Sequence, residues 1–188
     1  STGYIHPNYN KEKVHLCRYA DDFIVTAKNK ETLLEIQQMI EKFMEERGLK
    51  LSEEKTVITN INDGFDFLGW NFRKFKEKLL IQPSRKSKQK VTKSLSRTIK
   101  YYHEASQELL IIKLNQITRG WAEYHHCVCA KKTYALIDHR LWEMLWKWAK
   151  RRHPRKGRKW IKNRYWHPKG NREWSFRTDR AILYQMMD

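Results

Sequence analysis

The stretch "HLCRYADDFIV", residues 15–25, decides the fold, because it places two adjacent aspartates between two apolar runs. Residues 14–27 are predicted to form two β-strands joined by a tight Ala-Asp-Asp connection, a hairpin with an exposed acidic tip. Adjacent carboxylates repel unless a cation balances them, and their oxygens are ligands that Mg²⁺ prefers. Taken alone, the pair is also an ordinary hairpin tip, since aspartate is a common turn former.

The residues that follow predict a helix and more strands. Within "KETLLEIQQMIEKFMEERGLKLS" (30–52) the apolar residues recur near helical spacing and Gly48 suits a C-cap, which predicts a helix of about 17 residues. "KTVITNI" (55–61) and "FDFLGWNF" (65–72) are predicted strands with Asn-Asp-Gly turn chemistry between them. A second hairpin, from "WNFRKF" to "LLIQP", leads to Pro83.

Beyond Pro83 the periodicity is helical. Residues 87–104, 106–127 and 131–152 are predicted to form three consecutive helices with short links, a small bundle. Gly120 is expected to interrupt the second helix, and Pro154 to close the third. The helical spacing assigns these residues to the core: Leu109, Leu110, Leu114, Ile117, Trp121, Leu141 and Leu145.

Charge divides the chain into two parts. The net charge is +18, yet residues 1–82 hold 13 basic and 13 acidic residues, while 83–188 hold 26 and 8. The second part is therefore expected to meet a polyanion. Eight Trp, nine Tyr and seven Phe argue against a disordered basic tail. Residues 153–188, rich in Gly, Pro, Arg and Trp without a clear period, are expected to be irregular.

Three cysteines, an odd number, indicate a reducing compartment rather than a disulfide framework. The N-terminus carries no apolar segment of a secretory signal, and no apolar run approaches the roughly 20 residues of a membrane span. "HHCVC" (125–129) has poor spacing for zinc, because no second ligand pair follows at zinc-finger distance. Core packing and a helix-end histidine are the favoured interpretation there.

Four motifs occur in a fixed order: "HLCRYADDFIV", "GLKLSEEKT" (48–56), "FDFLGWNFRKF" (65–75) and "LNQITRGWAEYHH" (114–126). This series resembles the reverse transcriptases encoded by group II introns, also called intron maturases. The resemblance implies an α+β fold: a partial reverse-transcriptase palm in 1–82, a three-helix thumb, or domain X, in 83–152, and a basic aromatic nucleic-acid-binding tail in 153–188.

The resemblance also assigns roles in the first part of the chain. Asp21 and Asp22 would hold two catalytic Mg²⁺ ions, with Tyr19 and Ala20 beside the primer and template. Lys55 would neutralise phosphate charge or protonate the pyrophosphate leaving group, although a solvated lysine at a strand start explains it equally well. The primer-grip hairpin would comprise Phe67, Leu68 and Gly69, where ordinary strand packing of the first two is the alternative.

In the basic part, cationic and aromatic residues alternate along the sequence. This pattern suits binding of RNA or single-stranded DNA, because the cations neutralise phosphates and the aromatic rings stack on bases. By helical spacing, Trp142, Trp146 and Trp148 are assigned to the core rather than to base stacking. The same alternation of charge with Trp160, Tyr165, Trp166 and Trp174 is interpreted as nucleic-acid contact. The nucleic-acid-binding candidates are Arg119, Lys150, Arg151, Arg152, Arg155, Lys156, Arg158, Lys159, Trp160 and Arg164.

The implied function is binding of intron RNA to promote splicing, together with RNA-directed DNA synthesis from a DNA primer or target and dNTPs. The chain begins about 20 residues before the acidic turn, so the fingers and a further palm aspartate are expected on an N-terminal segment, joined or separate. Alone, the chain is expected to lack polymerase activity. The alternative is a non-catalytic RNA-binding maturase remnant or RNA chaperone. The resemblance implies a bacterial cytoplasmic or organellar setting.

Overall fold

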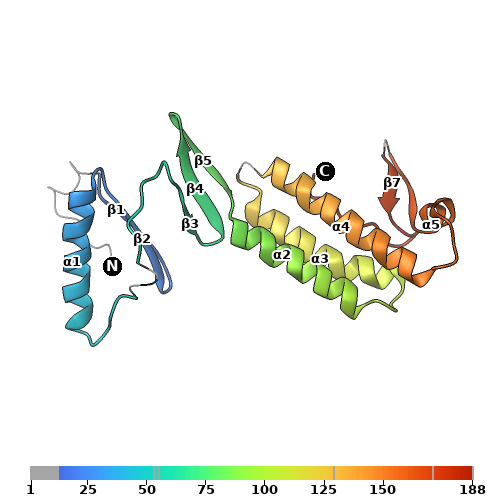
Figure 1. Ribbon diagram of the computed structural model, residues 1–188, viewed down its shortest axis with the longest axis horizontal. Coiled ribbons are helices and arrows are strands. Elements are labelled where there is room, and N and C mark those ends of the chain that lie inside the picture. The colour runs from blue at the N-terminus through green and yellow to red at the C-terminus, as the bar shows by residue number, and fades with distance from the viewer. Residues whose placement is uncertain (1–12, 53, 55, 129, 171, 188) are drawn as a thin grey trace. The chain divides into compact units, whose positions relative to one another are not determined.

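The computed structural model describes residues 13–52, 54, 56–128, 130–170 and 172–187, with the backbone alone at 172 and 173. The described residues form an α+β fold of five helices and three small antiparallel sheets, as predicted (Figure 1). The chain divides into two compact units, residues 1–63 and 64–188. Each unit is described by itself.

The first unit contains one hairpin and one helix. Strands β1 (His15–Tyr19) and β2 (Asp22–Thr26) pair antiparallel with Tyr19 opposite Asp22, which confirms the predicted hairpin and its tight connection. Helix α1 (Lys30–Glu45) begins where the Asn29 side chain accepts a hydrogen bond from the Thr32 amide at 2.9 Å. It ends as expected near Gly48, whose φ of 67° suits a left-handed cap.

The strand predicted at 55–61 is wrong for the residues described there, since 56–61 have no regular structure. A run of β-branched residues becomes a strand only when a neighbouring strand satisfies its backbone and its side chains can pack. In the described part of the first unit, β1 and β2 pair with each other and with no third strand. Val57 is correspondingly exposed.

The second unit opens with a three-stranded antiparallel sheet in the order β3-β4-β5. The predicted hairpin is confirmed between β4 and β5, while the predicted single strand 65–72 is broken by a turn at Leu68–Gly69. The rings of Phe65 and Phe72 stack 5.3 Å apart across β3 and β4. The strands are β3 (Phe65–Phe67), β4 (Trp70–Phe75) and β5 (Lys78–Pro83).

Three helices follow the sheet and form the predicted bundle (Figure 1). Ser84 and Ser106 cap the first two, each accepting a hydrogen bond from the amide three residues on. The expected break at Gly120 is wrong: the helix runs through it, because burial of its apolar face outweighs the ~1 kcal/mol glycine penalty. The helices are α2 (Arg85–Tyr101), α3 (Gln107–His125) and α4 (Lys131–Arg152).

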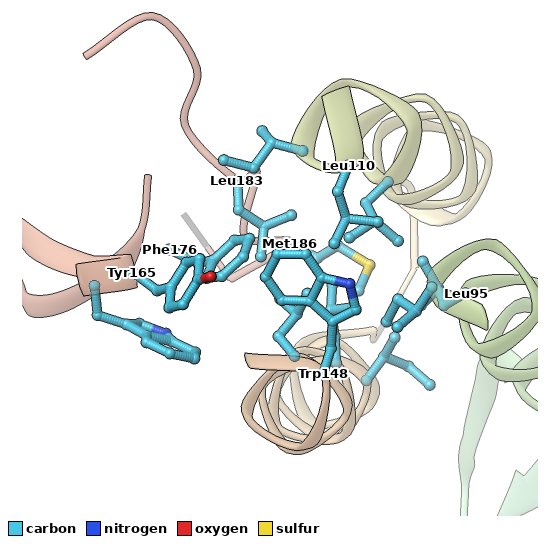
Figure 2. Packing of buried hydrophobic residues seen from close by; sticks show 14 of the residues in the cluster. Leu95, Leu110, Trp148, Tyr165, Phe176, Leu183 and Met186 are labelled. Carbon is cyan, nitrogen blue, oxygen red and sulfur yellow. The ribbon is translucent and has the colours of Figure 1, made fainter. Parts of the chain in front are cut away.

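The core lies inside this bundle and extends to the C-terminus (Figure 2). Leu110, Leu114, Leu141 and Leu145 are buried as predicted, and Ile117 and Trp121 are partly buried against them. The assignment of Leu109 is wrong: its side chain is 40% exposed. It lies one position before Leu110, and neighbouring helix positions face about 100° apart.

The segment after the bundle differs from the expected irregular tail. Helix α5 (Arg158–Tyr165) leads into a hairpin of β6 (Trp166–Lys169) and β7 (Arg172–Phe176). Its aromatic and aliphatic side chains join the core, where the Trp148 ring lies among them (Figure 2). Glycine and proline content predicted an irregular segment here, but its buried members supply the apolar area that lets it fold against the bundle: Ile161, Tyr165, Trp166, Phe176, Leu183 and Met186.

Polar side chains of the bundle also fix this segment. The Gln107 Nε2 donates to the Tyr165 carbonyl oxygen at 2.8 Å, and the Asn115 Nδ2 donates to that of Ile182 at 2.8 Å. The Asn115 amide oxygen accepts from the Tyr184 backbone at 2.7 Å. Residues 153–188 are therefore part of the same unit as the helices. No helix within the described residues has the length and apolarity to cross a membrane.

Candidate nucleic-acid interface

The acidic turn presents its carboxylates outward. Ala20 has a φ of 51°, which lets a two-residue turn connect β1 and β2. The Arg18 Nε donates to the Ala20 carbonyl oxygen at 2.9 Å and holds the turn from one side. Asp21 and Asp22 are exposed, and so is the flanking Tyr19. The local geometry therefore offers two adjacent carboxylates and one aromatic ring to an outside partner.

The chemistry of this pair suits a hard divalent cation, because both donors are carboxylate oxygens. None of the ion pairs within the described residues uses Asp21 or Asp22. Among the described residues, no three or more acidic, histidine or cysteine side chains are grouped so that they could hold a metal ion. Two carboxylates would supply only part of the shell of about six ligands that Mg²⁺ takes. Lys55 lies outside the described residues.

A second feature is the strained turn between β3 and β4. Leu68 and Gly69 both have positive φ, 49° and 83°, as a type I′ turn requires. A leucine in this conformation costs about 1 kcal/mol. The Tyr124 hydroxyl of α3 donates to the Leu68 carbonyl oxygen at 2.7 Å, and the Ser84 amide donates to that of Gly69 at 2.9 Å. The bundle therefore holds the predicted primer-grip turn in place.

Beneath the turn lies a buried histidine. His125 is 1% exposed, and its Nε2 lies 3.1 Å from the Ser87 hydroxyl, which also accepts from the Trp121 indole at 3.0 Å. The ring of Trp70, the first residue of β4, meets the imidazole edge-on at 4.4 Å. Burial lowers the pKa of His125 from 6.5 to about 4, so the imidazole is neutral at pH 7.

These groups border an open groove of about 780 Å³ between the β3–β4 turn, α2 and α3. Lys86 and Lys90 line one side of the groove on α2. Gly120 leaves open space where a side chain would stand, since an added Cβ would meet nothing within 4 Å. Small polar side chains with two lysines suit a sugar–phosphate backbone. One carboxylate, that of Asp66, also lines the groove. The other lining residues are Leu68, Gly69, Ser84, Ser87, Val91, Ser94, Ile117, Trp121, Tyr124 and His125.

The buried imidazole makes stability depend on pH. Because its folded pKa of about 4 lies below the unfolded value of 6.5, only the unfolded state gains a proton as pH falls between these values. Stability that is complete above about pH 6.5 is expected to fall by up to about 3 kcal/mol by pH 4. Urea unfolding of wild type and His125→Gln across this range measures it. Equal losses in both proteins would contradict the assignment.

A third feature is the basic segment, defined here as residues 150–164, which comprises the end of α4, the connection to α5 and most of α5. Its candidate side chains are all exposed. His153 accounts for its shape: the ring packs on Trp160 at 4.7 Å, and its Nε2 lies 2.7 Å from the Tyr165 hydroxyl. Lys156 lies 5.3 Å over the Trp160 ring. Arg119 lies apart from this segment, on α3, where it covers the Tyr184 ring.

Two aromatic assignments made from sequence are wrong. Tyr165 and Trp166 were interpreted as nucleic-acid contacts, yet both are buried among Trp148 and Phe176. Alternation of aromatic and basic residues is also what an amphipathic segment shows when its aromatics face inward. Trp160 and Trp174 remain exposed. The core assignment of Trp148 is confirmed, and Trp142 and Trp146 are partly buried against the core.

Arg152 differs from its neighbours, because it is tied to the protein. Its guanidinium donates to the carbonyl oxygens of His103 and Ala105 at 3.0 and 2.7 Å. We expect Arg152→Ala to lower the free energy of unfolding by about 1 kcal/mol. Its loss of RNA affinity should be no larger than the loss caused by Arg151→Ala. We expect Arg151→Ala to change stability by less than about 0.5 kcal/mol. Thermal unfolding of both variants compares the two roles, and equal melting temperatures would contradict the distinction.

The "HHCVC" stretch divides between interior and surface. His125 is buried at the end of α3 as the favoured interpretation expected, whereas His126 and Cys127 are exposed. Cys129 lies outside the described residues. Ser87, Tyr124 and His125 were not among the site residues predicted from the sequence. The sequence signal for these residues was the stretch "WAEYHH", in which a tyrosine and a histidine adjoin at the end of a predicted helix, shortly after a tryptophan.

Comparison with known proteins identifies both halves of the chain. Residues 3–72 match the family model of reverse transcriptase (RNA-dependent DNA polymerase). Residues 85–166 match that of the group II intron maturase-specific domain. No curated protein among those compared matches the chain. The first match contains the acidic turn, and the second contains the bundle and the whole basic segment. With these two segments in this order, the chain belongs to the reverse transcriptase/maturases of group II introns.

Proposed function

We propose that the chain binds group II intron RNA through its second unit and promotes splicing of that RNA. The observation that carries this proposal is the exposed basic segment supported by a buried aromatic frame. Lysine and arginine side chains that are exposed and positioned by a rigid support neutralise phosphates and release counterions, which drives RNA binding. The division into 1–82, 83–152 and 153–188 remains our functional assignment.

We assign the acidic turn to nucleotidyl transfer in the polymerase that contains it. Asp21 and Asp22 would hold Mg²⁺, together with a carboxylate from another segment. When bound, the metal supplies charge stabilisation for the attacking and leaving oxygens of phosphoryl transfer. Tyr19 would flank the primer terminus. Lys55, by family resemblance, would neutralise phosphate charge nearby.

The groove gives the primer-grip turn a physical role in this proposal. Leu68 and Gly69 are fixed by hydrogen bonds from α3 and from the start of α2. A nucleic-acid backbone lying along the groove would meet Lys86 and Lys90 on its far side. Held turns of this kind position a strand without reading its sequence. The proposed partners, which the family resemblance implies, are intron RNA, a DNA primer or target, dNTPs, and the N-terminal fingers and palm segment.

A maturase without polymerase activity is the second candidate function. One observation favours it: the basic segment, the groove and their core all lie within the 64–188 unit, apart from the acidic turn. RNA binding would then need neither Asp21 nor Asp22. Either protein would act where the intron RNA is made, in the bacterial cytoplasm or an organelle.

Splicing of a precursor RNA tests the shared proposal. At Mg²⁺ concentrations too low for self-splicing, we expect the protein to raise the splicing rate of its own intron. An unrelated basic protein of equal charge is the control, because general charge neutralisation also helps RNA fold. A rate no higher than that control produces would contradict the proposal.

A further inference from the structure

One face of α4 carries a row of aromatic rings outside the basic segment. His139, Trp142 and Trp146 recur at three and four residues, so they lie on one face of the helix. The His139 and Trp142 rings are 6.4 Å apart at 11°, and those of Trp142 and Trp146 are 5.5 Å apart at 15°. Three rings in succession are therefore nearly parallel.

A fourth ring joins this row from the C-terminal hairpin. Trp174 of β7 has its centroid 6.3 Å from that of Trp146 and 6.5 Å from that of Trp142, and it is 40% exposed. The Lys162 ammonium lies 4.8 Å over its ring. Here we name the four rings and Lys162 the aromatic ledge.

The aromatic ledge has a rigid floor. Trp166 is 2% exposed, and its ring lies 5.2 Å from that of Trp146 and 5.1 Å from that of Phe176. The cavity beneath is only about 20 Å³, lined by Trp142, Trp166 and Trp174 among others. Such a space holds about one water molecule. A ligand therefore cannot insert under the ledge and must stack on its outer side.

The surroundings select a negatively charged ligand. Lys150 lies one helical turn beyond Trp146 and is exposed. The acidic neighbours have partners: Glu143 pairs with His139 at 3.6 Å, and the Asp138 carboxylate accepts from the Met186 and Met187 amides. His139 and Trp174 are exposed, and Trp142 and Trp146 are partly exposed. Planar rings beside Lys150 and Lys162 combine the two elements of single-stranded nucleic-acid binding.

We propose that the aromatic ledge stacks an unpaired base of single-stranded RNA, while Lys162 and Lys150 contact the flanking phosphates. The inference rests on the proposed RNA binding and adds a base-contacting site to it. Base–aromatic stacking tolerates any sequence because every base has a π-face. The ledge thus adds affinity for unpaired loops or junctions over duplex regions of the same RNA, which phosphate contacts alone do not distinguish.

Binding of labelled oligonucleotides by fluorescence anisotropy tests the ledge. The probes are an oligo(A) RNA of about 12 nucleotides and an abasic ribose-phosphate chain of the same length. We expect Trp174→Ala to weaken oligo(A) binding by about tenfold and to leave abasic binding unchanged. Trp174→Phe should restore most of the affinity. Leu136→Ala, an equally exposed apolar residue on α4, is the matched control and should change neither.

The outcomes distinguish failure of the aromatic ledge from failure of the proposed RNA binding on which it rests. Equal oligo(A) affinity for Trp174→Ala and Leu136→Ala, or an equal loss for the abasic chain, would overturn the ledge and leave RNA binding intact. Absence of binding to both probes by wild type would overturn the proposed function itself. Photo-crosslinking of wild type to 4-thiouridine RNA needs no variant. Crosslinks at Trp142, Trp146 or Trp174 support the ledge, and crosslinks confined elsewhere contradict it.

Discussion

Replacing Asp21 and Asp22 with asparagine is expected to lower primer extension by about 10³-fold or more in the polymerase that contains them. Asparagine keeps the size and exposure of each side chain but removes the charge that holds Mg²⁺. Losing metal stabilisation of a phosphoryl-transfer transition state costs several kcal/mol, and about 4 kcal/mol corresponds to this factor. The measurement is single-turnover extension of a DNA primer on an RNA template by that polymerase.

The control is Glu35→Gln with Glu45→Gln, which removes two exposed carboxylates from α1. That variant makes the same change in net charge and should extend the primer at the wild-type rate. RNA affinity should be equal in all three proteins, because the acidic turn and the basic segment belong to different units. Primer extension by the double asparagine variant at more than a tenth of the wild-type rate would remove the metal assignment.

The second large effect is expected at the basic segment. Changing Arg155, Lys156, Arg158 and Lys159 to glutamine should weaken binding of intron RNA by about 10³-fold near 0.1 M KCl, since each phosphate contact contributes close to a factor of six there. The four side chains are exposed, and none forms an ion pair within the described residues. Stability should therefore change little. Filter binding measures the affinity, and thermal unfolding checks the fold.

A charge-matched variant shows whether position matters. Changing Lys76, Lys78, Lys131 and Lys132 to glutamine removes four exposed charges elsewhere in the same unit. We expect this variant to lose less than about tenfold in affinity. An equal loss in the two variants would mean that net charge alone attracts the RNA and that residues 150–164 are not a specific contact surface.

Local chemistry made much of the fold predictable. The Asp-Asp hairpin, the helix that ends near Gly48 and the three helices of the bundle depend on turn residues, caps and apolar spacing, all of which are read within a short window. The prediction of a strand at 55–61 was wrong because a strand needs a neighbouring strand to pair with, and no local pattern reveals whether one is present. The prediction of a helix break at Gly120 was wrong for the opposite reason, because packing of the helix outweighed the local glycine penalty.

The candidate site was predictable where a motif carries it. Asp21, Asp22 and the Leu68–Gly69 turn follow from quoted motifs. The contact that fixes the Leu68–Gly69 turn does not, since Tyr124 reaches the Leu68 carbonyl oxygen from a helix distant in sequence. Likewise, Tyr165 and Trp166 resemble surface aromatics in sequence, and only tertiary packing shows them buried. Arg152 resembles Arg151 until its bonds to the α2–α3 connection are seen.

The most direct test of the account is the salt dependence of intron-RNA binding by wild type and by the Arg155, Lys156, Arg158 and Lys159 glutamine variant. If these residues neutralise phosphates, log K should fall steeply and linearly with log[KCl] for wild type. The slope of the variant should be shallower by about 3, near 0.7 for each lost single-strand contact. A wild-type affinity independent of salt, or two identical slopes, would contradict the claim that this segment binds the RNA backbone.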